Sequence, residues 1–197
     1  MNNNALLIVF SGPSGVGKDT VLKKLLKKKD NIKISVSATT RKQRKGEIDT
    51  VDYFFISKEQ FLAEIEKDGM IEYAQYCDNF YGTPKEKVFD DLNKGYDVIL
   101  EIETQGALQV IDKFKEAVSI FIAPPSFGEL ENRLKNRHTD SDDVIAKRLA
   151  VAKKELALFK KYDYTVINDD IDECVDNIIN IINSEKLKSS RTNLLFE

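Results

Sequence analysis

A glycine-rich segment near the start of the chain has the residue types that bind phosphate groups. Three glycines run through it, and a lysine follows the last of them in the pattern Gly-x-x-x-x-Gly-Lys. Glycines let the backbone curl so that successive N–H groups face an anion, and the lysine adds one positive charge. The residues predicted to cradle phosphate are Gly12, Pro13, Ser14, Gly15, Val16, Gly17 and Lys18.

The elements on either side of this segment fit the same chemistry. Residues 5–10 are apolar throughout and predict a buried strand, and Val21, Leu22, Leu25 and Leu26 recur at helical spacing. A helix that begins at the loop adds its N-terminal N–H groups and its dipole to the anion site. The strand–loop–helix order therefore supports phosphate binding.

One position departs from the usual pattern. The residue after the lysine is normally Ser or Thr, whose hydroxyl binds Mg²⁺, but here Asp19 stands there and Thr20 follows. A carboxylate beside a polyphosphate repels it unless a cation lies between them. Two arrangements stay open: Asp19 holds the ion through water, or it points away while Thr20 contacts phosphate.

The rest of the chain alternates short apolar runs with helical patterns. Runs at 98–100, 118–122 and 165–167 resemble the first strand, whereas 33–37 alternates apolar and polar residues. Longer amphipathic stretches cover 142–162 and 171–182. This order predicts an α/β fold with a P-loop parallel sheet core and helices on both faces.

The stretch from about residue 37 to 89 breaks this rhythm. It is rich in Tyr, Phe, Arg and Gly, and it predicts an inserted small mixed α/β subdomain. Within it, Arg41 and Arg44 lie near tyrosines, and guanidinium and phenol groups suit a phosphate monoester. The alternative is a surface arginine pair beside an aromatic core. The GTPase patterns Asp-x-x-Gly and Asn-Lys-x-Asp are not found, which argues against a GTPase switch.

The amino-acid composition of the chain argues against several classes of protein. A net charge of −3, from 30 basic and 33 acidic side chains, argues against a protein built to grip nucleic acid. The chain has 2 cysteines and 1 histidine, too few for a disulfide scaffold or a Cys/His zinc site. The apolar run at 5–10 is far shorter than the roughly 20 residues of a membrane span. We expect a cytoplasmic protein with reduced thiols and no membrane contact.

From about residue 6 to 187 the chain resembles the guanylate kinases of bacterial type. The resemblance rests on motifs in order, at 12–18, 37–47 with Tyr53, 72–74, 81–84, 101–103 with 105–107, and 168–169. It implies an ATP-dependent transfer of the γ-phosphoryl group to GMP, with dGMP as a second acceptor, giving ADP and GDP in purine nucleotide metabolism. It also implies one domain over 1–197, with a core of 1–36, 91–127 and 156–190, a GMP-binding subdomain of 37–90 and a helical lid of 128–155.

The resemblance also assigns the GMP site. The implied residues are Ser37, Arg41, Arg44, Glu47, Tyr53, Glu72, Tyr81, Gly82, Thr83 and Glu101. The arginines and tyrosines would hold the phosphate, whereas Ser37, Glu72 and Thr83 would read the base. A carboxylate can accept from guanine N1 and N2, and hydroxyls can donate to O6. Glu101 and Glu103 face one side of a strand end, and which of them meets GMP and which orients Mg²⁺ stays open.

On the ATP side the resemblance extends the phosphate cradle. Added to residues 12–18 are Asp19, Thr20, Arg133, Arg137 and Asn168. The residues implied in catalysis are Lys18, Arg41, Arg137 and Arg148, since cations stabilise the charge on a moving phosphoryl group. Mg²⁺ would be held through phosphates and water, with Asp19, Thr20 and Glu103 as its candidate protein partners. His138 stands where the family commonly has glycine in the lid turn.

Two other functions compete with this prediction. Guanylate-kinase-like modules without catalysis bind phosphopeptides, but they tend to have eroded P-loops, and this chain keeps Lys18 and the loop glycines. A kinase for another nucleoside or sugar phosphate is opposed by Ser37, Glu72 and Thr83. The expected partners are ATP and GMP alone, with no nucleic acid or membrane, and the protein is expected to be a monomer or weak homo-oligomer.

Overall fold

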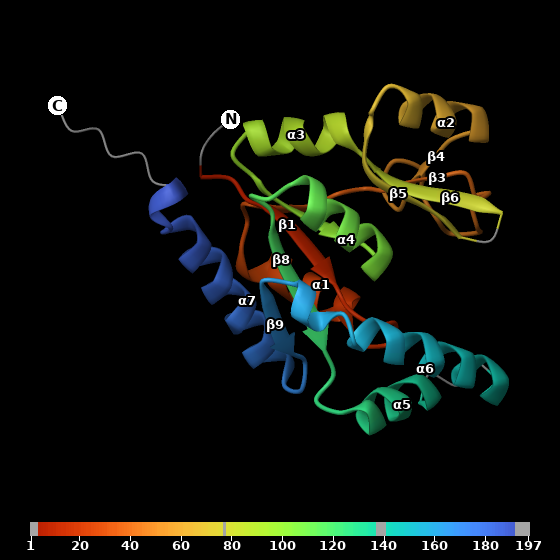
Figure 1. Ribbon diagram of the computed structural model, residues 1–197, viewed down its shortest axis with the longest axis vertical. Helices are drawn as coiled ribbons and strands as arrows, with labels where there is room; N and C mark the ends of the chain where they lie inside the picture. Colours follow the sequence, from red (N-terminus) through yellow and green to blue (C-terminus); the bar gives the residue numbers. More distant parts are fainter. Residues whose placement is uncertain (1–3, 77, 137–140, 192–197) are drawn as a thin grey trace.

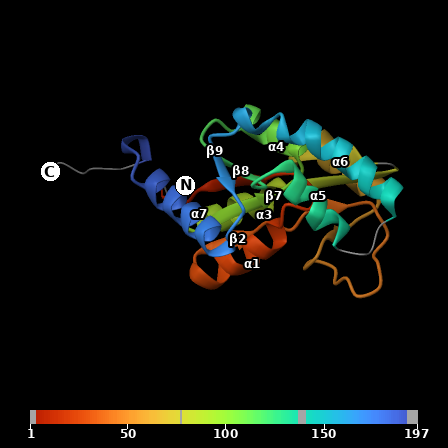
Figure 2. The ribbon, with the colours of Figure 1, turned by 90° about the horizontal axis from the view of Figure 1, so that it is seen from below.

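The computed structural model describes residues 4–76, 78–136 and 141–191. Its centre is a parallel β-sheet (Figures 1 and 2). The strand order in this sheet is β2-β7-β1-β8-β9. The strands are β1 (Leu7–Ser11), β2 (Ile32–Ile34), β7 (Asp97–Glu101), β8 (Val118–Ala123) and β9 (Tyr164–Ile167). The predicted parallel core is therefore confirmed, and each central apolar run forms a strand within about two residues of its expected place.

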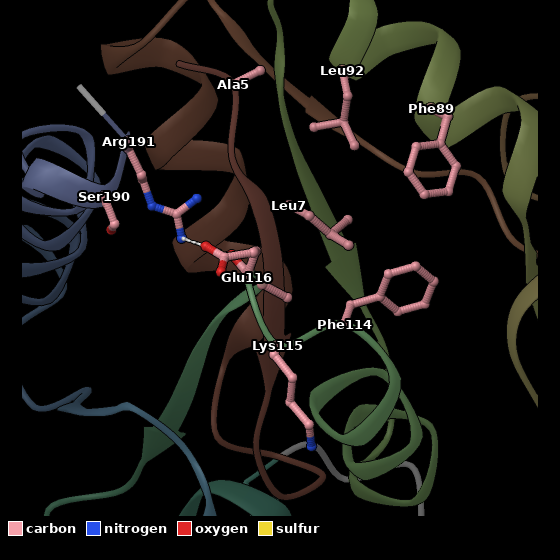
Figure 3. A pocket seen from close by; sticks show the side chains of 10 residues that line it. Ala5, Leu7, Phe89, Leu92, Phe114, Lys115, Glu116, Ser190 and Arg191 are labelled. Atoms are coloured by element: carbon pink, nitrogen blue, oxygen red, sulfur yellow. Dashed lines mark hydrogen bonds and ion pairs between the residues drawn. The ribbon is translucent and has the colours of Figure 1, made fainter. Parts of the chain in front are cut away.

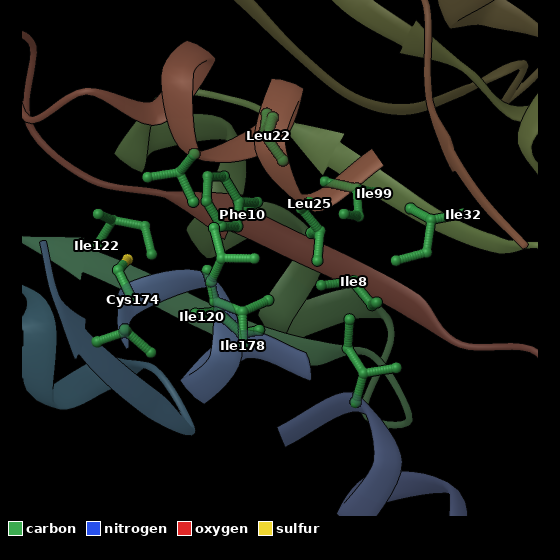
Figure 4. Packing of buried hydrophobic residues seen from close by; sticks show 14 of the residues in the cluster. Ile8, Phe10, Leu22, Leu25, Ile32, Ile99, Ile120, Ile122, Cys174 and Ile178 are labelled. Atoms are coloured by element: carbon green, nitrogen blue, oxygen red, sulfur yellow. The ribbon is translucent and has the colours of Figure 1, made fainter. Parts of the chain in front are cut away.

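Helices cover both faces of this sheet, as the sequence predicts. α1 (Lys18–Lys28) and α7 (Ile171–Lys186) lie on one face, where Ile8 and Phe10 of β1 meet Leu25 and Ile178 (Figures 2 and 4). α3 (Lys85–Asn93) and α4 (Thr104–Lys113) pack on the other face, against Leu7 and Val9. Alternate residues of β1 thus serve two cores, which is why this strand is apolar at every position.

The inserted segment forms a sheet of its own beside the core (Figure 1). Its strands are β3 (Ala38–Thr39), β4 (Phe54–Phe55), β5 (Met70–Tyr76) and β6 (Asn79–Pro84), in the order β4-β3-β6-β5. α2 (Lys58–Glu66) is capped by Ser57, whose side chain accepts from the Gln60 N–H in a capping box. Phe61 of α2 is buried with Ala38 and Met70, so the predicted mixed α/β insertion is confirmed.

Two further helices, α5 (Phe127–Lys135) and α6 (Asp142–Leu156), pack against each other. They bury a small apolar cluster between them, made of Leu130, Leu134, Ile145 and Ala152. The amphipathic pattern over 142–162 gives a shorter helix than it suggests. α6 ends at Leu156, since 3₁₀-type bonds follow at Leu158 and in η1 (Phe159–Lys161); a further turn, η2 (Ser189–Arg191), follows α7.

The parallel topology brings distant segments to one edge of the sheet. The glycine-rich loop follows β1, β7 ends at Glu101 with Glu103 just after it, and Asn168 follows β9. All of these lie at the carboxyl ends of their strands, which is the edge where parallel sheets bind ligands. In the part of the chain described here, no helix is long and apolar enough to cross a bilayer.

Candidate active site

Two adjoining cavities lie at this carboxyl edge. The first, which we call the P-loop cavity, measures about 410 Å³ and is lined by Ser14, Gly15, Gly17, Lys18, Asp19, Thr20, Tyr53, Glu101, Ile102 and Glu103. The second, the insertion cavity, measures about 300 Å³ and is lined by Ser37, Arg41, Arg44, Tyr53, Glu72, Ala74, Tyr81, Gly82, Glu101, Ile102, Glu103, Gln105 and Gly106. They share a wall formed by Tyr53 and residues 101–103.

The P-loop cavity is built around the start of α1. Gly17 is the N-cap of this helix and has φ 96°, a left-handed conformation that favours glycine. Lys18 follows as the first helical residue, and its Nζ donates to the carbonyl oxygen of Gly12 at 2.7 Å. Burial lowers the pKa of Lys18, and the charges of Glu101 and other nearby carboxylates oppose this shift. The amine is thus folded over a loop whose first helical N–H groups remain available to an anion.

Asp19, in the first turn of α1, faces Glu101 at the carboxyl end of β7. It is hydrogen-bonded to Glu101, whose pKa is raised to about 7 by burial and by the Asp19 charge, while Lys18 acts in the opposite direction. Both carboxyl groups and the Thr20 hydroxyl line the P-loop cavity. The residue that departs from the usual pattern therefore belongs to a carboxylate cluster between the two cavities.

This cluster predicts a pH-dependent stability. Because the folded-state pKa of Glu101 lies near 7, above its ordinary 4.5, the stabilising effect of its proton is complete below about pH 4.5 and is lost as the pH rises through about 7. Glu101→Gln stays neutral, so its melting temperature should exceed that of the wild type by at least about 3 °C more at pH 8 than at pH 5. Differential scanning calorimetry without nucleotide measures this. Parallel pH profiles for the two proteins would contradict it.

Arg41 stands at the rim of the insertion cavity in a fixed orientation. Its guanidinium makes a two-point ion pair with Glu47, at 2.8 and 2.9 Å, and lies over the Tyr53 ring at 5.3 Å. The pair with Arg41 lowers the pKa of Glu47 to about 2. Glu47 itself is not part of the cavity wall; it also accepts from the backbone N–H of Arg44 at 2.7 Å. Glu47 thus orients the Arg41 guanidinium and holds the backbone at Arg44.

The opposite end of the insertion cavity is a buried carboxylate. Glu72 of β5 is 5% exposed, and the hydroxyl of Thr83 on β6 donates to its Oε1 at 2.7 Å. Glu72 lies where the register between β5 and β6 shifts, between Met70 and Tyr73. Burial raises the pKa of Glu72, and the hydrogen bonds from Thr83 oppose the rise. Ser37 and Gly82 line the same cavity, whereas Thr83 lies behind Glu72.

Three predicted residues that are not part of the P-loop contact it, one from α5, one from α6 and one that follows β9. Arg148 on α6 donates to the Ser14 hydroxyl at 2.7 Å. Arg133 on α5 donates to the carbonyl oxygen of Asn168 at 2.9 Å, and the Asn168 side chain donates to that of Val16 at 2.8 Å. Arg133 and Asn168 thus support the loop backbone and do not line its cavity. Arg137 and His138 lie outside the described residues.

Glu155 is a residue that the sequence analysis did not name. It lies near the end of α6, receives a hydrogen bond from the Thr104 hydroxyl at 3.4 Å and another from the Ser14 backbone, and faces the charge of Lys18. Burial raises its pKa. Its spacing from Arg148, two helical turns, places both on one face of α6 and could have pointed to it.

A third cavity lies away from this chemistry, at the amino end of β1 (Figure 3). It measures about 510 Å³, and Leu7, Phe89 and Phe114 line it together with Arg191, which donates to the Glu116 carbonyl oxygen at 2.7 Å. It shares no lining residue with the other two cavities. Its mostly apolar wall contrasts with the charged walls of the P-loop and insertion cavities.

Comparisons with known proteins agree on one family. The guanylate kinase family model matches residues 4–185. A guanylate kinase of Clostridioides difficile is 53% identical over 98% of this chain and 94% of its own length, and one of Caldanaerobacter subterraneus is 50% identical over 100% and 95%. The crystal structure of guanylate kinase from Anaplasma phagocytophilum covers 95% of this chain and 89% of its own, with 39% identity and a TM-score of 0.75.

Proposed function

The chain belongs to the guanylate kinase family, and from this premise we propose that it transfers the γ-phosphoryl group of ATP to GMP, giving ADP and GDP. The observation that carries the proposal is the common wall of the two cavities, formed by Tyr53 and residues 101–103. A donor phosphate in one cavity and an acceptor phosphate in the other would lie next to each other at this wall. Direct transfer requires this proximity, because the acceptor oxygen must reach the γ-phosphorus in line with the leaving group.

We propose that ATP occupies the P-loop cavity through its phosphates. The N-terminal N–H groups of α1 and the Lys18 amine supply positive charge to the anion. When ATP binds, Lys18 Nζ is expected to leave the carbonyl oxygen of Gly12 for the β- and γ-phosphates. Arg133 and Asn168 are proposed to act at the same end, through the loop backbone that they contact.

For the acceptor, the insertion cavity offers groups of the right chemistry at each end. Arg41, Arg44, Tyr53 and Tyr81 are proposed to bind the GMP phosphate, with Glu47 holding the Arg41 guanidinium and the backbone of Arg44 in place. Ser37, Glu72 and Thr83 are proposed to recognise guanine, because its N1 and N2 donors match a carboxylate. Adenine lacks a proton on N1 and would leave the buried carboxylate facing a lone pair.

Catalysis then follows from cations placed around the moving group. Negative charge spreads over the phosphoryl oxygens in the transition state, and Lys18, Arg41, Arg137 and Arg148 are proposed to stabilise it. Arg148 already reaches the P-loop through Ser14. Closure of the helical segment 128–155 would exclude water, so that GMP and not water accepts the phosphoryl group.

The carboxylates that line the P-loop cavity fit Mg²⁺ that arrives with ATP. Mg²⁺ in such enzymes is held by one or two carboxylates together with phosphate oxygens and water. Asp19, Thr20 and Glu103 line the P-loop cavity and would supply oxygen ligands to the ion. Within the described residues, no group of three or more His, Cys, Asp or Glu side chains could hold a metal ion. When bound, the ion neutralises charge on the β- and γ-oxygens.

We propose that the protein acts in the cytoplasm on ATP and GMP, with dGMP as a second acceptor, as a monomer or weak homo-oligomer, without nucleic acid or membrane. The alternative of a phosphopeptide-binding module without catalysis has no supporting observation, since Lys18 and the P-loop cavity are intact.

An acceptor panel tests the proposal. ADP release, coupled to NADH oxidation, is measured with ATP, Mg²⁺ and GMP, AMP, CMP or UMP. Because several polar groups read the base together, kcat/KM should favour GMP by about 10²-fold or more. Equal rates with AMP would contradict the assignment of Glu72 to the base. Binding of GMP without turnover of any acceptor would favour the binding module.

A further inference from the structure

The room beside Glu72 comes from a residue with no side chain. We propose that Gly106 is a positioning residue for guanine specificity: only glycine at this place lets the Glu72 carboxylate lie where it reads the base. The proposal rests on the proposed function and deepens it, because it names a specificity determinant on the core helix α4 and not on the insertion.

The geometry at Gly106 leaves no space for a methyl group. Gly106 is the third residue of α4, and it is buried. A Cβ atom added there would lie 2.4 Å from Glu72 Oε2 and 3.1 Å from its Cδ. Nonbonded carbon and oxygen atoms prefer separations of about 3.5 Å or more, so any side chain at this place would displace either the helix or the carboxylate.

The helix is the part that is held. Gln109, one turn further along α4, donates to the Tyr73 carbonyl oxygen at 2.9 Å and accepts from the Tyr73 N–H at 3.4 Å. Tyr73 follows Glu72 in β5, so α4 is clamped to the strand beside the carboxylate. Ala107 and Val110 are fully buried in the core against β1 and β7. A helix tied at both places cannot retreat from β5 without losing hydrogen bonds and core packing.

The Glu72 carboxylate, unlike the helix, can move. It is the far end of a flexible side chain, and its Oε1 is oriented by the Thr83 hydroxyl at 2.7 Å. A methyl group at position 106 would push Oε2 away and break the orientation that Thr83 imposes. Guanine N1 and N2 would then meet a misplaced acceptor, while the P-loop cavity, which Gly106 does not line, would be unchanged.

A substitution at Gly106 should affect the recognition of GMP and the stability of the protein in different ways. Alanine is more favourable than glycine within a helix, so a purely structural glycine in an ordinary helix turn should be improved by this change. Gly106→Ala should therefore fold with an unchanged or raised melting temperature and still lose GMP. That combination is not expected of a residue that only fills space in the helix.

The test compares Gly106→Ala with Lys113→Ala, which changes an exposed residue at the end of the same helix that lines neither the insertion cavity nor the P-loop cavity. Gly106→Ala should raise the KM for GMP by about 10- to 100-fold, with the KM for ATP within about twofold. Lys113→Ala should leave both KM values unchanged. A wild-type KM for GMP in Gly106→Ala, or a melting temperature lowered by more than about 5 °C, would overturn the proposal.

A double-mutant cycle shows whether the effect passes through Glu72. If it does, Glu72→Gln/Gly106→Ala should have a KM for GMP within about threefold of Glu72→Gln alone, because the carboxylate is already lost. Effects that multiply would overturn the positioning role. A wild-type protein that fails to phosphorylate GMP would instead remove the proposed function, so the two failures are distinguishable.

Discussion

Replacing Lys18 by alanine should lower kcat by about 10²–10³-fold or more and leave the affinity for GMP within about twofold. Lys18 Nζ lies over the P-loop, 2.7 Å from the carbonyl oxygen of Gly12. Its positive charge adds to the attraction that the backbone N–H groups of the loop have for phosphate. The variant keeps the glycine backbone but lacks the cation at the site of transfer. Lys18 does not line the insertion cavity, so GMP binding should survive.

The measurement for Lys18 needs both a rate and a binding constant. Coupled ADP release gives kcat, and calorimetric titration with GMP gives its affinity. Lys23→Ala is a matched control, because Lys23 is an exposed lysine of the same helix and does not line the cavity. Turnover by Lys18→Ala at the rate of Lys23→Ala would remove the P-loop amine from the mechanism. Loss of GMP affinity in Lys18→Ala would show that the two cavities are coupled.

Arg148→Ala is expected to reduce kcat by about 10²–10³-fold, with the KM for GMP changed by less than about threefold. Arg148 extends from α6 to the Ser14 hydroxyl at 2.7 Å, so its guanidinium is at the P-loop before any nucleotide binds. A cation there should interact more strongly with the transition state than with bound ATP, since charge spreads to the phosphoryl oxygens during transfer.

Two further variants separate charge from geometry at this position. Arg148→Lys keeps the charge but lacks the planar fork, so it should recover only part of the rate. Lys147→Ala removes the neighbouring exposed lysine and should behave as the wild type. A kcat of Arg148→Ala within about threefold of the wild type would exclude Arg148 from transition-state stabilisation.

Several site features follow from local sequence because the interactions that form them are local. The loop at 12–18 lies between a strand and a helix that its neighbours specify, and the glycines permit its backbone directly. Arg41 and Glu47 are only a few residues apart, and their pair forms within one loop. The sequence therefore indicated the glycine-rich loop and pointed to Arg41 and Arg44, which line one cavity, although it did not show that Glu47 holds Arg41 in place.

Contacts between distant segments could not be predicted in this way. Asp19 and Glu101 meet because β1 and β7 are neighbours and their carboxyl ends share one edge of the sheet. Arg133 and Asn168 come from α5 and the end of β9, and both turn to backbone oxygens around the P-loop. Each residue type was identified in the sequence, but its partner depended on strand order and helix packing.

By itself the sequence determined the α/β core, the anion-binding loop and the resemblance to one family, since apolar periodicity, glycine spacing and ordered motifs are properties of the chain. Tertiary structure alone decided that the two cavities share a wall and that Gly106 of α4 lies against Glu72 of β5. The reason is physical: such contacts depend on how separate elements pack, to within fractions of an ångström, and no local pattern encodes that distance.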